Sequence, residues 1–271
     1  MVKKKVKETI KKSTVETPEE KDDQEKTTSS TENPPKEPNK KKKRYGGKIK
    51  RVGTGVKNLD SLIQRGFNNN STNLLVGPSG SGKTILSVQF LIEGIKKGEK
   101  CLYIAFEEKR EEFYQNLREV GYDLEKLERE GKFFFLEYSP QKVKTMLDEG
   151  GGAIETLVLT KKITRIVFDS ATSFILLFDN ELDKKDATLA LFTLVKGWKC
   201  TTLLILEEDP KDELKSSKVL NLEADGIILL YFERKEKKRE RKLEVLKMRG
   251  TAHSLGLHKY EITNKGITVS K

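Results

Sequence analysis

The sequence predicts an α/β fold with a mainly parallel sheet flanked by helices and a set of antiparallel β-hairpins at its carboxy-terminal end. Up to about residue 206, short apolar runs that fit strands alternate with helical patterns, an order typical of a parallel sheet covered on both faces. A glycine-rich loop joins one of these strands to one of these helices. The last four strand-like segments follow one another without helices between them, so we expect them to pair as antiparallel hairpins.

The expected elements can be placed along the chain from their periodicity. Strands are predicted at residues 74–76, 101–106, 133–138, 163–169, 201–206, 226–232, 242–249, 257–263 and 266–269. Helices are predicted at residues 85–95, 109–120, 152–161 and 186–197, with a short one after the turn near residue 56. The two cysteines, Cys101 and Cys200, are too few for a metal site, and each begins a strand, so we expect both in the core.

Composition divides the chain into two parts. Residues 1–48 hold four of the seven prolines and one aromatic residue, which predicts a disordered tail, and residues 49–271 are expected to form one folded domain. The tail carries 15 basic and 9 acidic residues, so it holds six of the eleven net positive charges. Its basic run, Lys40–Arg44, fits a nucleic acid, an acidic partner or an anionic surface, but also a solvated tether.

The apolar runs exclude two other classes of protein. None approaches the roughly 20 residues that a membrane-spanning helix needs, so no span is expected. The first residues are basic but no apolar stretch follows them, so they do not resemble a secretory signal. We therefore expect a cytoplasmic protein.

The glycine-rich loop has the pattern of a phosphate-binding site. Glycines let the backbone amides approach a polyphosphate, and the following helix adds the positive end of its dipole. Lys83 would supply a full positive charge to the phosphates, and Thr84 would offer its hydroxyl to Mg²⁺. The predicted nucleotide-binding residues are Gly77, Pro78, Ser79, Gly80, Ser81, Gly82, Lys83, Thr84 and Ile85.

Acidic residues end several of the predicted strands, where ligand sites of open α/β sheets lie. Asp169 is the candidate that holds Mg²⁺ together with Thr84, although an aspartate there would also cap a helix. Glu107 and Glu108 are the candidates that polarise a water for attack on the γ-phosphate, with Glu107 first; the alternative is a pair of ordinary helix-N-terminal acids. The pair Glu207–Glu208 is a weaker rival that a surface loop would also explain.

Taken together, these motifs resemble the KaiC-type branch of the RecA superfamily. The resemblance rests on Leu59–Asp60, the loop from Gly77 to Thr84, Gln89–Leu91, Phe106–Glu108, Asp169–Ser170 and the segment from Lys247 to His253, and it runs from about Val52 to Ile262. It implies a RecA-like P-loop NTPase core with a single KaiC domain, ATP and Mg²⁺ as its ligands, and water activation by Glu107 and Glu108.

The resemblance also implies a site shared between subunits. In such ATPases a Lys-x-Arg-Gly-Thr-x-His segment reaches the nucleotide of the neighbouring protomer, and it maps onto Lys247, Arg249, Thr251 and His253. Because Lys247 and Arg249 are two residues apart on a predicted strand, they share one face and can converge on one anion. A residue that acts on the site of a neighbouring subunit, in trans, needs a head-to-tail contact between subunits, so we expect a homo-oligomer. By analogy with the family, we expect this oligomer to be a hexameric ring.

Three functions fit the sequence. The first is an ATP-hydrolysing homo-oligomeric ring with an unknown client. The second is a DNA-binding recombination or repair accessory, although the loops after the strands at 163–169 and 201–206 carry acids that roughly offset their lysines, where a DNA channel should be more basic. The turn Arg234–Arg239 could bind DNA instead, or be charged only to stay solvated. The third is a nucleotide-gated signalling scaffold that hydrolyses very slowly.

Overall fold

The computed structural model describes residues 50–148, 150–212 and 218–270, which all lie in one compact unit, Gly46–Lys271. The predicted tail, residues 1–48, lies outside the described residues. Within the described part of the chain, no helix is long and apolar enough to cross a membrane.

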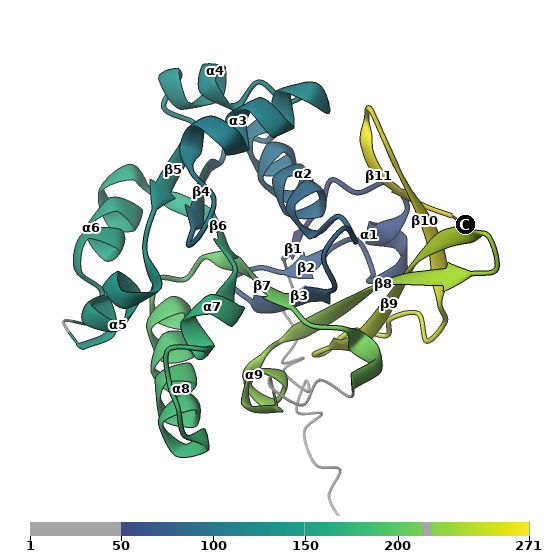
Figure 1. Ribbon diagram of the computed structural model, residues 1–271. Coiled ribbons are helices and arrows are strands. Elements are labelled where there is room, and N and C mark those ends of the chain that lie inside the picture. The colour runs from purple at the N-terminus through teal and green to yellow at the C-terminus, as the bar shows by residue number, and fades with distance from the viewer. Residues whose placement is uncertain (1–49, 149, 213–217, 271) are drawn as a thin grey trace, which may run out of the picture. The chain divides into compact units, whose positions relative to one another are not determined.

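A nine-stranded sheet is the centre of the described structure (Figure 1). Its strand order is β11-β10-β9-β8-β3-β7-β6-β4-β5, and the strands from β8 to β5 in this order run parallel. The sequence predicts the parallel arrangement of β3, β7, β6, β4 and β5. The parallel strands are β3 (Thr72–Gly77), β4 (Lys100–Ala105), β5 (Phe133–Glu137), β6 (Ile163–Asp169), β7 (Thr201–Glu207) and β8 (Gly226–Lys235). The antiparallel strands are β9 (Lys238–Met248), β10 (His258–Thr263) and β11 (Gly266–Val269), and a separate small pair is β1 (Arg51–Val52) with β2 (Phe67–Asn68).

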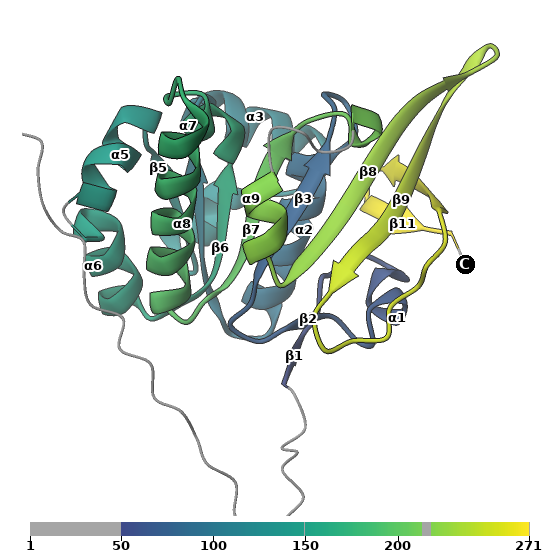
Figure 2. The same ribbon diagram turned by 90° about the horizontal axis from the view of Figure 1, so that it is seen from below.

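Helices cover both faces of the sheet (Figure 2). One face packs against α1 (Leu59–Leu62), α2 (Lys83–Lys96), α3 (Arg110–Glu119) and α4 (Leu124–Arg129). The other face packs against α5 (Pro140–Asp148), α6 (Gly152–Lys161), α7 (Ala171–Ile175), α8 (Glu181–Gly197) and α9 (Lys218–Glu223). Successive residues of β3 alternate between these layers, since Leu75 belongs to the first core and Leu74 and Val76 to the second. Cys101 and Cys200 are free and buried, as expected.

The sequence predicts β8 as part of a separate hairpin appendage, and the structure differs from this prediction. It pairs antiparallel with β9, but it also pairs parallel with β3, from Asn73–Gly226 to Val76–Leu229. The apolar run from Gly226 to Leu230 is buried, which is typical of a strand covered on both faces. The antiparallel strands therefore extend the main sheet, and β8 lies directly beside the strand that leads into the phosphate loop.

Candidate functional site

The phosphate loop connects the end of β3 to the start of α2, as the motif predicts. Gly80 and Gly82 have φ angles of +79° and +92°, which side-chain-bearing residues rarely adopt, so glycine is required there. The loop is held from the carboxy-terminal strands, because the hydroxyl of Tyr260 donates to the carbonyl of Ser81. The hydroxyl of Ser81 is buried and has no hydrogen-bond partner within the described structure. An unsatisfied buried donor in this loop fits a site that takes an anion.

A cavity of about 590 Å³ opens beside this loop. Its lining residues are Ser79, Gly80, Gly82, Lys83, Thr84, Ile85, Asp169, Glu207, Arg241 and Ile262. The ammonium of Lys83 donates to the carbonyl of Pro78 at 3.0 Å. Burial lowers the pKa of Lys83, while the negative charges of Glu207 and Asp169 oppose that shift. A polyphosphate in the cavity would add negative charge next to this partly desolvated lysine and favour its charged form.

The predicted metal residues, Thr84 and Asp169, lie together in the wall of the cavity. Thr84 Oγ1 donates to Asp169 Oδ2 at 3.2 Å, and the hydroxyl of Tyr103 donates to the same oxygen at 2.5 Å. Asp169 lines the cavity, but most of its surroundings are protein, and this burial raises its pKa. The hydrogen bond from Tyr103 and the positive charge of Lys83 act in the opposite direction and lower the pKa. A hydroxyl and a carboxylate beside a phosphate loop are the hard oxygen donors that Mg²⁺ takes, so these residues fit the ion.

The tandem acids line a smaller cavity of about 160 Å³ that shares Thr84, Asp169 and Glu207 with the first. Glu107 is exposed and accepts a hydrogen bond from Ser173 on α7. Glu108 is half-buried and accepts from Asn116 on α3 at 3.1 Å. Burial and the neighbouring charges of Asp169 and Glu112 raise the pKa of Glu108, and the Asn116 bond acts in the opposite direction. The structure thus brings both predicted acids beside the predicted metal residues.

Two residues that were not expected at the phosphate cavity, Glu207 and Arg241, also line it. Glu207, interpreted as a weaker rival or a surface acid, pairs in register with Gly77 and lines both cavities. Arg241 was not singled out; its guanidinium donates to the carbonyl of Gly80 at 3.3 Å and lies over the ring of Phe232, 4.5 Å from the centroid. The signal for Glu207 was its place at a strand end, whereas Arg241 was hidden within a long run of charged residues.

The residues assigned to the neighbouring subunit lie away from the cavity of their own chain. Lys247 pairs with Ile227, which pairs with Leu74, three residues before the loop begins at Gly77. Lys247 and Arg249 share a face, as predicted, since both donate to the carbonyl of Leu222 at the end of α9, at 3.1 and 2.9 Å.

The other two residues of that segment have local partners as well. Thr251 accepts from Arg51 at 2.8 Å, and His253 Nδ1 donates to the carbonyl of Ser254 at 3.0 Å. Within the described residues, none of the four hydrogen-bonds to the phosphate loop of the same chain or lines its cavity.

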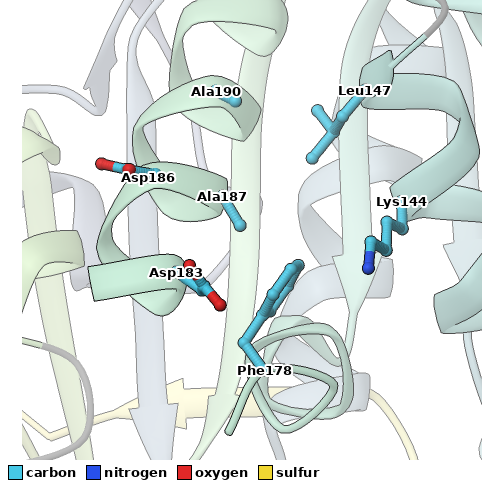
Figure 3. Close-up of a pocket in the computed structure, with 7 residues that line it drawn as sticks. All are labelled: Lys144, Leu147, Phe178, Asp183, Asp186, Ala187 and Ala190. Atoms are coloured by element: carbon cyan, nitrogen blue, oxygen red, sulfur yellow. The ribbon is translucent and has the colours of Figure 1, made fainter. Parts of the chain in front are cut away.

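A separate cavity of about 390 Å³ lies between α5 and α8 (Figure 3). Lys144 Nζ lies 5.5 Å from the ring centroid of Phe178, and Asp183 and Asp186 line the opposite wall on α8. None of the predicted site residues borders this cavity. The predicted phosphate, metal and water-activating residues instead line the two cavities where β3, β4, β6 and β7 end.

The fold and the site together define a RecA-like α/β domain with a phosphate-binding loop. A family model described as "ATPase: KaiC" matches residues 52–271, and the chain belongs to that family.

Named relatives agree with this assignment. The UPF0273 protein of Thermotoga maritima is 30% identical over 234 residues, which cover 82% of this chain and 96% of that protein. The circadian clock protein KaiC3 of Synechocystis is 32% identical over 233 residues, but this chain spans only 46% of its length. The crystal structure of a KaiC-like protein from Pyrococcus horikoshii has a TM-score of 0.73 at 30% identity and covers 82% of this chain and all of that one.

Proposed function

We propose that residues 49–271 form a Mg²⁺-dependent ATPase domain that works as a homo-oligomer, with a ring as the expected form. The observation that carries the proposal is the convergence of Lys83, Thr84, Asp169 and the tandem acids on two cavities that share walls. ATP rather than another nucleotide follows from the family, whose model is described as an ATPase.

In this proposal each residue has a defined task. The loop amides and Lys83 bind the phosphates, and Arg241 adds a second cation from the same chain. Thr84 and Asp169 would hold Mg²⁺, which neutralises phosphate charge when bound. Glu107 and Glu108 orient the attacking water and accept its proton, and the hydrogen bonds from Ser173 and Asn116 fix their directions.

Lys247, Arg249, Thr251 and His253 would complete the site of the adjacent protomer. Their distance from the cavity of their own chain, described above, fits a role in trans. A head-to-tail contact that repeats closes into a ring or continues as a filament.

The first experiment measures steady-state ATP hydrolysis and oligomeric mass for the wild type and for E107Q, E108Q and the double variant. Removing a general base lowers the rate about 10²- to 10⁴-fold, so the double variant should lose turnover while it keeps its assembly. The matched control is E111Q, which changes an exposed glutamate in the first turn of α3. Turnover of the double variant within a few-fold of E111Q would contradict the assignment, and assembly without turnover in the wild type would favour the signalling scaffold.

A mixing experiment tests the shared site. K83A protomers lack the phosphate lysine, and K247A/R249A protomers lack the cations proposed to act in trans, so each should be inactive alone. In a randomly mixed ring, about one quarter of the interfaces join an intact loop to an intact trans segment, so the mixture should recover up to that share of the wild-type rate. No recovery from variants that assemble and keep their wild-type melting temperatures would contradict a role in trans.

A further inference from the structure

The outer end of the β8–β9 hairpin is a two-stranded ribbon that pairs with no third strand of the described structure (Figure 2). β8 pairs with β3 only as far as Leu229, and β9 pairs with β10 no further out than Lys242. Residues 232–241, which we call the ribbon, pair only with each other and project beyond the rest of the sheet. At about 3.3 Å per residue, the four cross-strand pairs extend about 13 Å.

The tip of the ribbon, residues 234–239, holds positive charge that no carboxylate of the described residues neutralises through an ion pair. Its cations are Arg234, Lys235, Lys237, Lys238 and Arg239, against one acid, Glu236. All are exposed, and none forms an ion pair with a carboxylate of any residue that the structure describes.

The two acids that flank the tip, Glu233 and Glu240, already have partners. Glu233 pairs with Lys211 at 3.0 Å and with Lys242 at 3.1 Å, and Glu240 pairs with Lys259 at 3.5 Å. Charge compensation therefore stops one residue short of the tip.

Like charges face one another across the ribbon. Arg234 lies directly opposite Arg239, and Lys235 lies directly opposite Lys238. Like charges at directly opposite positions destabilise a hairpin. Solubility alone does not require the charges to be placed in this unfavourable arrangement. An anionic partner would turn these repulsive pairs into attractive contacts.

The form of the ribbon selects among polyanions. A two-stranded ribbon fits the major groove of duplex DNA, whose phosphates line both sides of the groove. The aromatic ring of the ribbon, Phe232, is covered by Arg239 and Arg241, whose guanidinium carbons lie 4.9 and 4.5 Å from its centroid. Because that ring is covered, it offers no surface on which single-stranded bases can stack.

We infer that the ribbon binds duplex DNA through the phosphate backbone, with no sequence preference, by entering the major groove. The test variant is R234Q/K235Q/K237Q/K238Q, which leaves Arg239 and Arg241 over Phe232. The matched control, K96Q/K100Q/K161Q/K185Q, removes four exposed lysines elsewhere that form no ion pair within the described structure. Both keep residues 1–49, so any contribution of that segment to DNA binding is the same.

Fluorescence anisotropy with a labelled mixed-sequence duplex of about 20 base pairs, across a range of salt, measures affinity and its salt dependence. Each phosphate contact contributes about −0.9 to the slope of log K against log salt, so the ribbon variant should lose about 3 to 4 of that slope and at least about tenfold in affinity. The control should stay within about twofold of the wild type at moderate salt.

Three results would overturn the inference. One is an equal loss of affinity in the control, which would mean that net charge alone decides binding. Another is single-stranded DNA of the same sequence binding as tightly as the duplex. The third is polyglutamate of equal charge displacing the duplex as effectively as unlabelled DNA, which would indicate an acidic protein as partner.

Discussion

Arg165 holds together the elements that carry the candidate site, so its removal should cost measurable stability. Its side chain is fully buried (0% exposed) and bonds both carboxylate oxygens of Glu99, each at 2.9 Å. It also donates to the carbonyls of Gly53 at 2.8 Å and Phe90 at 2.7 Å. Arg165 thus ties β6, which ends at Asp169, to α2, which begins at the phosphate loop.

The substitution R165M keeps the volume but removes the charge and the donors. Breaking a buried pair by removing one partner costs about 3 to 5 kcal/mol. Glu99 is 27% exposed and can turn to water, whereas the carbonyl of Gly53 loses its donor, so we expect a value near the lower end, about 3 kcal/mol. Urea unfolding with linear extrapolation measures the loss. R129M is the control, because Arg129 is 71% exposed and lies 3.9 Å from Glu125, a pair worth less than about 1 kcal/mol.

The same pair predicts how this loss depends on pH. Burial alone would raise the pKa of Glu99, but hydrogen bonds and charge from Arg165 outweigh it and hold the pKa below its ordinary value of 4.5. A carboxyl with a lowered pKa in the folded state contributes stability above its unfolded pKa and loses it as the pH falls through the folded value. The gap between wild type and R165M should therefore narrow below about pH 4.5. A loss of less than about 1 kcal/mol at neutral pH, or a gap that widens in acid, would refute the reasoning.

Three further predictions concern the site. N116A removes the hydrogen bond that opposes the raised pKa of Glu108, so the acidic limb of the pH–rate profile for ATP hydrolysis should move to higher pH; an unmoved limb contradicts a role for Glu108. D169N should stabilise the nucleotide-free protein, because the pKa of Asp169 is raised above 3.8, which means that the charged carboxylate destabilises the folded state. The gain in free energy of unfolding, measured with urea, should grow as the pH rises from about 4 to 7, and a gain that does not change with pH would contradict this. E207Q removes a negative charge from the phosphate cavity and should tighten ADP binding in calorimetry, by at most about tenfold, and weaker binding would argue against that placement.

Local rules were sufficient to predict the centre of the site. The phosphate loop lies where its glycine pattern requires, and Glu107 and Asp169 meet because the carboxyl ends of neighbouring parallel strands share one edge of the sheet. This prediction did not require knowing that β4 and β6 are neighbours, because parallel strands in any order place their carboxyl ends at the same edge of the sheet. The strands and longer helices could also be predicted locally, from apolar runs of suitable length bounded by turn residues, although the apolar residues of α6 do not gather on one face.

The rest depends on strand register, which local patterns do not contain. Arg241 reaches Gly80 only because β8 pairs with β3 and β9 pairs with β8, so a residue 161 positions away meets the loop. The parallel edge of β8 was missed because its close spacing to β9 indicated a hairpin, and the sequence does not show which other strand it joins. The short helices α4 and α9 span fewer than two turns, too few for a clear helical period, whereas α5 is amphipathic and was overlooked.

In the proposed trans contact, Lys247 and Arg249 would give up hydrogen bonds that they form within their own chain and form new ones to the nucleotide of the neighbouring protomer. Lys247 and Arg249 now donate to the neutral carbonyl of Leu222, at the end of α9, and Arg249 also forms an ion pair with Asp225 at 3.3 Å. Burial and the charge of Arg249 lower the pKa of Lys247, while the charges of Asp225 and Glu223 act in the opposite direction. Within the described residues, Lys247 forms no ion pair with a carboxylate. Phosphate oxygens of a neighbour's nucleotide would form charge-assisted bonds, which are stronger than bonds to a neutral carbonyl. Since that gain exists only with nucleotide bound, ATP should strengthen the contact between protomers, and the mass of the assembly should rise with ATP in the wild type but not in K247A/R249A.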